Sequence, residues 1–223
     1  MTKKLFFQAI SKFVFGLILI AFLLFLPAGT LKYWNGWLFI GILFIPMLIA
    51  GIVMMIRSPE LLKKRLDSKE EEKEQKTVIA LSGIMFLAAF VVAGLNFRFG
   101  WIVLPRWVVY AAAVIFLAAY LMYAEVLREN VYLSRTVEVQ ENQKVIDTGL
   151  YGIVRHPMYS ATLVLFLSMG LVLGSPISFV ILLSYIPLIA KRMKNEEEVL
   201  LQGLKGYEEY RRKVKYKIIP LIW

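Results

Sequence analysis

Four apolar runs, each long enough to cross a bilayer, constrain this 223-residue chain more than any other feature. They lie at residues 6–26, 37–56, 77–95 and 108–127. A bilayer core is about 30 Å thick, so a helix needs roughly 20 apolar residues to cross it. Two shorter apolar runs, 160–173 and 177–190, come later in the chain. Together the runs predict an all-α polytopic membrane protein with about five to six transmembrane helices.

The first apolar run follows a short basic start and so has the outline of a signal peptide. No small-residue cleavage pattern of the A-x-A type follows it clearly, and further apolar runs come after it. We therefore expect residues 6–26 to stay in the protein as an uncleaved first span. The overall composition, 59% hydrophobic, also exceeds that of ordinary soluble domains.

The two shorter apolar runs are separated by Gly174-Ser175-Pro176, which is a turn signal. They predict a tight C-terminal helical hairpin. Gly170 and Gly174 lie four residues apart, a spacing that gives a helix a small face for close approach of its neighbour. Residues 191–223 are polar and basic, and an apolar stripe through Tyr207 and Tyr210 predicts an amphipathic tail that rests on the bilayer or on the hairpin.

The placement of basic residues sets the orientation. Of the 26 Lys and Arg residues, only Lys32, Arg98 and Arg106 fall on the side opposite to the chain termini. By the positive-inside rule, we expect both termini and all the chemically interesting segments to face the cytosol. We divide the chain into an N-terminal region of four spans, 1–127, and a C-terminal region, 128–223, that carries the chemistry. A cytosolic loop, 57–76, is expected to contain a surface helix that begins after Ser58-Pro59.

Several classes of site are excluded by composition. The chain has no cysteine and one histidine, so disulfides, thiolate nucleophiles and zinc sites built from Cys or His are ruled out. It has neither a G-x-G-x-x-G nor a Walker A pattern. The net charge of +10 is explained by the positive-inside distribution, and we expect membrane lipids rather than nucleic acid as partners.

The single histidine lies in the stretch Arg155-His156-Pro157-Met158-Tyr159, directly before the first arm of the hairpin. Proline keeps His156 out of the α region and can open the next helix at its first position. A helix N-terminus with Arg155 and His156 beside it offers a corner for an anionic group. The alternative is that Arg155 reaches lipid phosphate and Tyr159 is an interfacial aromatic anchor.

An acidic cluster, Glu196 to Glu198, follows the second arm of the hairpin. Arg192 and Glu196 are four residues apart and share one helical face. One or two of these carboxylates would turn inward to bind hydroxyls or a cation, whereas the alternative is a solvated helix with ordinary ion pairs. Asn130 and Tyr132 either line a polar pocket or mark a helix end and an interface anchor.

These segments, in this order, resemble the isoprenylcysteine carboxyl methyltransferase family and related membrane phospholipid methyltransferases. The resemblance is carried by Gly149-Leu150-Tyr151, by Val154 to Tyr159, by Arg192-x-x-x-Glu196-Glu197, and by Gly206-Tyr207-x-x-Tyr210. It is strongest from about Asn130 to the end of the chain. The resemblance implies an S-adenosylmethionine-dependent methyltransferase, with carboxyl O-methylation favoured, that acts on a lipidic or amphiphilic acceptor from the bilayer.

The resemblance also implies the site residues. The catalytic set is His156, Arg155 and Glu196. Arg155 and His156 are expected to hold the carboxylate end of S-adenosylmethionine. Glu196, and Glu197 beside it, would accept from its hydroxyls or ammonium, with Arg192 holding Glu196. Tyr151, Pro157 and Tyr159 complete the cofactor-binding set.

Two other functions stay open at this point. The first is a membrane reductase of the sterol-reductase type, which would place NADPH at a similar cytosolic site. The second is a transporter or scaffold without catalysis. Transport is disfavoured because no span carries a charged residue near its centre, Glu125 being close to a span end.

Overall fold

The computed structural model describes residues 3–66, 73–134 and 137–223, and its regular structure there is helical, with no strand. Four long helices come first along the chain, with one short helix between the second and third. The elements are α1 (Lys3–Ala28), α2 (Trp34–Arg57), α3 (Pro59–Leu66), α4 (Lys73–Phe99), α5 (Arg106–Glu129), a 3-10 turn η1 (Gly149–Gly152), α6 (Pro157–Val172), α7 (Pro176–Leu182), α8 (Tyr185–Gly203) and α9 (Tyr207–Lys213).

The expected polytopic membrane fold is confirmed. In the described chain, five helical stretches are long and apolar enough to cross a membrane: Lys3–Ala28, Trp34–Arg57, Gln75–Phe99, Arg106–Glu129 and Pro176–Gly203. Helix α6 is apolar but shorter. The helix expected after Ser58-Pro59 is α3, and residues 67–72 of the same loop lie outside the described residues.

The hairpin turns where the sequence predicts, between α6 and α7. A Cβ atom on Gly170 would lie 2.4 Å from the backbone nitrogen of Phe179, so the two arms approach as closely as a glycine allows. Gly174 serves the turn itself, with φ at +71°. The apolar run of the second arm ends near residue 190, and α8 continues through the polar residues beyond it to Gly203. The added turns stay helical because they bury Met193 and Glu197 on one side.

At the turn end of the hairpin, polar side chains from the N-terminal spans meet the last carbonyls of α6. The hydroxyl of Tyr33 donates to the carbonyl of Leu173 over 2.6 Å, and the amide of Asn35 donates to that of Val172 over 3.1 Å. A helix leaves its last four carbonyls without internal partners, and in an apolar medium these must be satisfied. The N-terminal helices therefore cap the short helix α6.

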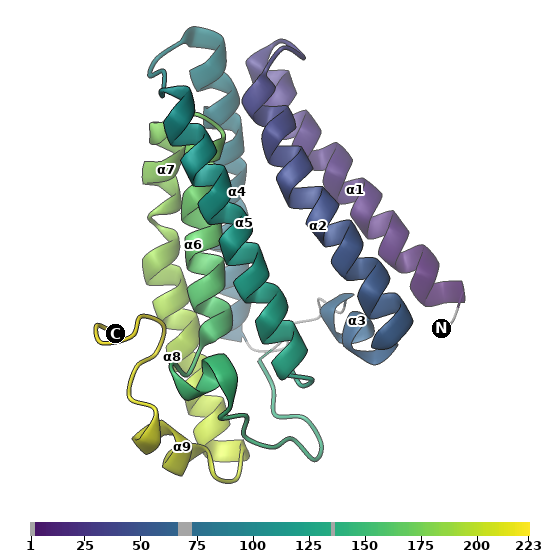
Figure 1. The fold of residues 1–223 in the computed structure, drawn as a ribbon, viewed down its shortest axis with the longest axis vertical. Coiled ribbons are helices and arrows are strands. Elements are labelled where there is room, and N and C mark those ends of the chain that lie inside the picture. Colours follow the sequence, from purple (N-terminus) through teal and green to yellow (C-terminus); the bar gives the residue numbers. More distant parts are fainter. Residues whose placement is uncertain (1–2, 67–72, 135–136) are drawn as a thin grey trace.

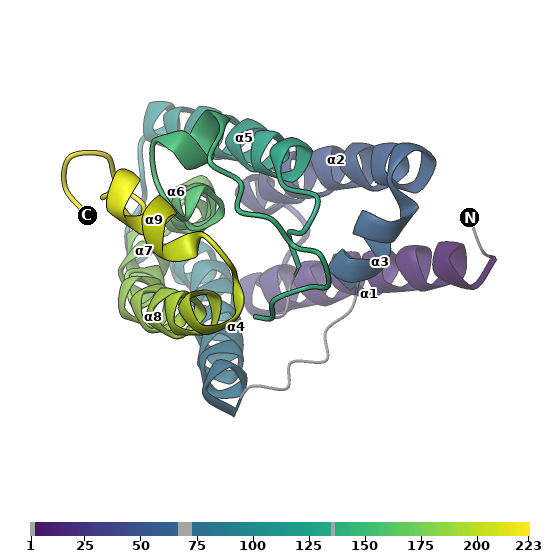
Figure 2. The same cartoon turned by 90° about the horizontal axis from the view of Figure 1, so that it is seen from below.

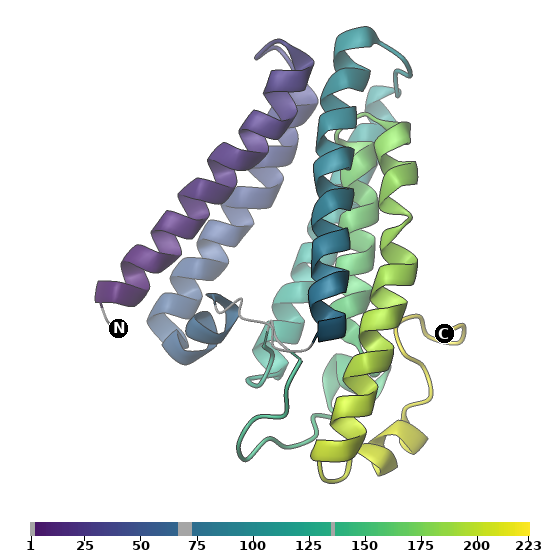
Figure 3. The same cartoon turned by 180° about the vertical axis from the view of Figure 1, so that it is seen from behind.

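Helices α4 to α8 form one bundle, and the pair α1 and α2 leans away from it toward one end (Figure 1, Figure 3). The largest helix pairing is that of α5 with α6. Both chain termini lie toward the end at which the pair α1 and α2 is separated from the bundle (Figure 1). Seen from that end, α3 lies between α1 and α2, whereas helix α9 and the segment after α5 lie over the bundle (Figure 2).

Candidate functional site

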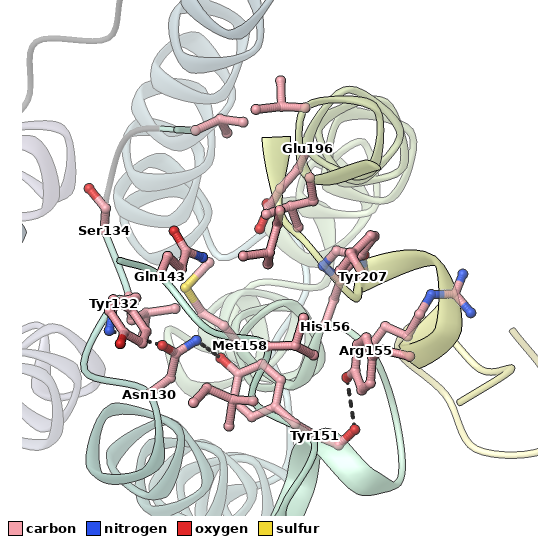
Figure 4. A pocket seen from close by; sticks show the side chains of 18 of the residues that line it. Asn130, Tyr132, Ser134, Gln143, Tyr151, Arg155, His156, Met158, Glu196 and Tyr207 are labelled. Atoms are coloured by element: carbon pink, nitrogen blue, oxygen red, sulfur yellow. Dashed lines mark hydrogen bonds between the residues drawn. The ribbon is translucent and has the colours of Figure 1, made fainter. Parts of the chain in front are cut away.

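A pocket lies at this end of the bundle, where α6 begins and α8 ends (Figure 4). It encloses about 850 Å³, counting the part open to solvent. Its walls come from three parts of the chain: the segment after α5, the η1–α6 corner, and α8 with α9. The lining residues are Asn130, Tyr132, Leu133, Ser134, Val137, Glu138, Gln143, Lys144, Val145, Ile146, Tyr151, Arg155, His156, Met158, Tyr159, Arg192, Glu196, Val199, Leu200, Leu204, Tyr207 and Tyr210.

The corner at His156 forms as the proline predicts. Pro157 is the first residue of α6, and His156 is its N-cap with φ at −126°, outside the helical region. The imidazole is buried, with 5% of His156 exposed, and its ring is roughly parallel to that of Tyr159, with 5.6 Å between centroids. Pro157 itself is not among the lining residues. Its role in the site is to begin the helix that carries Tyr159.

Tyr159 joins the two halves of the expected site. Its hydroxyl donates to a carboxylate oxygen of Glu196 and accepts from Nε of Arg192 over 3.0 Å. Arg192 and Glu196 share one face of α8, as their spacing predicts, and this tyrosine from α6 bridges them. Tyr159 thus holds the carboxylate of Glu196, and Arg192 in turn holds the Tyr159 hydroxyl, while Glu196 borders the pocket.

Glu197 faces the other way and is buried among cationic groups. Its Oε1 accepts from Nε and Nη2 of Arg155 over 2.8 and 2.7 Å and lies 3.3 Å from Nε2 of His156. Its Oε2 lies 3.3 Å from Nζ of Lys217. The side chains of Arg155 and Glu197 are 5% and 7% exposed. The anion-binding corner predicted at Arg155 and His156 is therefore filled by a carboxylate of the chain itself.

The C-terminal segment after α9 is bound to the same corner. The backbone nitrogens of Arg155 and His156 donate to the carbonyls of Tyr216 and Lys217 over 2.9 and 2.8 Å. Nη1 of Arg155 donates to the carbonyls of Val214 and Lys215 over 2.9 and 2.7 Å. In Figure 4 the guanidinium points away from the pocket toward this segment. Arg155 thus anchors the C-terminal segment to the start of α6.

The wall opposite α8 is ordered by Tyr151. Its hydroxyl accepts from the amide of Asn130 over 2.8 Å, and its carbonyl accepts from the hydroxyl of Tyr210, also over 2.8 Å. These contacts tie the end of α5, the turn η1 and helix α9 together (Figure 4). Asn130, which the sequence left as either a pocket residue or a helix end, is both, because it is also the C-cap of α5.

This region of the chain is similar to a known protein family. Residues 108–202, which include most of the pocket lining, match the family described as the isoprenylcysteine carboxyl methyltransferase (ICMT) family. Over these residues the chain is similar to that family. The isoprenylcysteine carboxyl methyltransferase match takes in α5, the η1–α6 corner, the hairpin and the acidic cluster of α8.

The fold of the whole chain agrees with the family. A solved structure of a eukaryotic intramembrane Ras methyltransferase, ICMT, is similar with a TM-score of 0.57 and 17% sequence identity. The similarity covers 97% of this chain and 84% of that one. Family and fold together support a membrane methyltransferase.

Of the eight site residues predicted from the sequence, six line the pocket: Tyr151, Arg155, His156, Tyr159, Arg192 and Glu196. It did not assign Gln143, Val145 or Tyr207 to the pocket. The segment around Gln143 and Val145 has no periodic pattern from which a fold follows. The sequence predicts Tyr207 as part of an apolar stripe of the tail, and in the structure this stripe packs on Val139 and Val145.

Proposed function

We propose that the protein uses S-adenosylmethionine to methylate the carboxylate of a lipidic or amphiphilic acceptor at the cytosolic interface. The observation that carries the proposal is the buried Tyr159 network. It holds the Glu196 carboxylate at the wall of a pocket, within the part of the chain that matches the methyltransferase family.

The residues of the pocket suit S-adenosylmethionine chemically. This molecule, when bound, supplies a methyl group on a sulfonium, and it presents a carboxylate, an ammonium, ribose hydroxyls and an adenine. The pocket offers a carboxylate acceptor at Glu196, a buried hydroxyl at Tyr207 with no partner among the described residues, and apolar side chains such as Leu133 and Val145. Pockets for small molecules commonly combine apolar walls with a few polar groups in this way.

Each residue then has a physical role in the proposal. Glu196 accepts hydrogen bonds from the hydroxyls or ammonium of the cofactor, and Tyr159 and Arg192 orient it. Tyr151 and Asn130 form the opposite wall. We assign Arg155 and Glu197 to positioning rather than to ligand contact, because their charged groups bind each other and the C-terminal segment. In-line displacement depends mainly on such positioning and on exclusion of water.

A carboxylate acceptor is favoured because, among the described residues that line the pocket, the one histidine already contacts a carboxylate. The single histidine is buried and its Nε2 faces the Glu197 carboxylate at 3.3 Å. An amine or hydroxyl acceptor needs a general base, whereas a carboxylate attacks as it is. We therefore infer O-methylation of a carboxylate, and the apolar surroundings favour a lipid-borne one.

The test is incubation of the purified protein in lipid nanodiscs with methyl-labelled S-adenosylmethionine and a total lipid extract. We expect label in a lipid-soluble product that releases volatile methanol in mild alkali, because methyl esters hydrolyse and methylated amines do not. Glu196→Gln should weaken binding of S-adenosylhomocysteine by about tenfold or more. Glu198→Gln, an exposed neighbour, is the matched control and should bind like wild type.

The competing reductase function predicts a different ligand. Stabilisation of the purified protein by NADPH, together with no response to S-adenosylhomocysteine in thermal unfolding, would overturn the methyltransferase proposal. Label in an alkali-stable product would retain methyl transfer but refute the carboxylate acceptor.

A further inference from the structure

Tyr207 carries a buried hydroxyl that has no partner among the residues the structure describes. The residue is 4% exposed, it begins helix α9, and it lines the pocket. A buried polar group without a hydrogen bond costs about 1–3 kcal/mol, and such groups are rare in native proteins. The hydroxyl therefore requires a partner that the described residues do not supply.

The neighbouring tyrosine of the same helix shows the contrast. Tyr210 lies three residues on, is 6% exposed, and also lines the pocket. Its hydroxyl donates to the carbonyl of Tyr151 over 2.8 Å. Tyr210 thus ties α9 to Tyr151 in the pocket wall, whereas the Tyr207 hydroxyl is available to a ligand in the pocket.

Tyr207 shares the pocket wall with the charged residues Arg155 and Glu196, and its ring belongs to an apolar cluster. Burial raises the pKa of its hydroxyl, and the nearby carboxylates of Glu197 and Glu196 raise it further, while Arg155 opposes them. The hydroxyl is therefore protonated and able to donate at any physiological pH. The part of the pocket lined by Leu133 and Ile146 is apolar.

We propose that the Tyr207 hydroxyl hydrogen-bonds the amino-acid end of the bound S-adenosyl ligand. The amino-acid end carries the carboxylate and the ammonium, so it belongs in the charged part of the pocket, and the nucleoside belongs against the apolar part. This inference rests on the proposed function. It adds a ligand-binding residue from α9, a helix that lies beyond residues 108–202 of the family match.

The experiment compares Tyr207→Phe with Tyr210→Phe and wild type, using calorimetric titration with two ligands and thermal unfolding without ligand. The first ligand is S-adenosylhomocysteine, and the second is 5′-methylthioadenosine, which lacks the amino-acid end. Tyr207→Phe should weaken S-adenosylhomocysteine about three- to tenfold, the effect of one lost hydrogen bond, and leave 5′-methylthioadenosine unchanged. Its unfolding temperature without ligand should not fall, because no hydrogen bond within the protein is lost.

Tyr210→Phe is the structural control and should lower the unfolding temperature, since it leaves the buried Tyr151 carbonyl without this donor. Three results would overturn the inference: unchanged affinity of Tyr207→Phe for S-adenosylhomocysteine, an equal loss of affinity for both ligands, or destabilisation like that of Tyr210→Phe. Failure of the wild type to bind S-adenosylhomocysteine would instead overturn the proposed function, and this inference with it.

Discussion

At the scale of single residues, the adjacent glutamates Glu196 and Glu197 of α8 lie in different surroundings. Glu196 borders the pocket and is held by Tyr159, whereas Glu197 is buried against Arg155, His156 and Lys217. Successive side chains on an α-helix point about 100° apart, so neighbours in sequence reach different surroundings. A buried carboxylate beside several cations is costly to remove, because the cations then lie buried without their counter-charge.

We expect Glu197→Gln to destabilise the protein by about 3–5 kcal/mol, because the Arg155 guanidinium loses its buried counter-ion. The measurement is denaturant or thermal unfolding in detergent. Glu198→Gln is the control, and as an exposed substitution it should change stability by no more than about 0.5 kcal/mol. Equal stability of the two variants would show that Glu197 does not anchor the corner.

At the scale of elements, the hairpin determines where the site residues meet. Helix α6 begins at the site with Pro157, and the chain returns through α7 and α8 to bring Glu196 beside Tyr159. The register of the two arms depends on Gly170, where the backbone of Phe179 occupies the space a side chain would need.

Gly170→Ala should therefore destabilise the protein by about 1–3 kcal/mol through overpacking, even though alanine favours a helix more than glycine does. Gly51→Ala in α2 is the matched control, because a Cβ there meets nothing within 4 Å. The control should be neutral or slightly stabilised. Unfolding temperatures of the two variants in one detergent provide the measurement, and a stable Gly170→Ala would argue against the close approach.

At the scale of the whole molecule, the chemistry gathers at one end of the bundle. Helices α3 and α9 and both termini lie toward the same end, and the connection from α4 to α5 lies at the other (Figure 1). The pocket is lined by residues of α9 and of the start of α6, so it lies at the first end. The sequence places nearly all its basic residues on that first side. By the positive-inside rule we propose that the pocket end is cytosolic.

The absence of native cysteine makes this orientation simple to test. We expect Glu208→Cys, at an exposed position of α9, to react with a membrane-impermeant maleimide only after cells are permeabilised. Val103→Cys, which replaces an exposed residue of the α4–α5 connection, should react in intact cells. The reverse pattern would place the pocket on the outer side.

By itself, the sequence determined the apolar spans, the hairpin turn and the helix start at Pro157. These follow from local signals: run length, the geometry of glycine and proline, and the needs of the backbone in lipid. The resemblance to a family added Tyr159, Arg192 and Glu196 as parts of one site.

Only the tertiary structure decided how that site is divided. It separated Glu196 from Glu197, bound Arg155 to the C-terminal segment, and turned Tyr207 into the pocket. It also set the end of α8 at Gly203, beyond the apolar run. These outcomes depend on which element packs against each face of a helix. Contacts between residues distant in sequence determine that packing, and the local sequence pattern does not contain them.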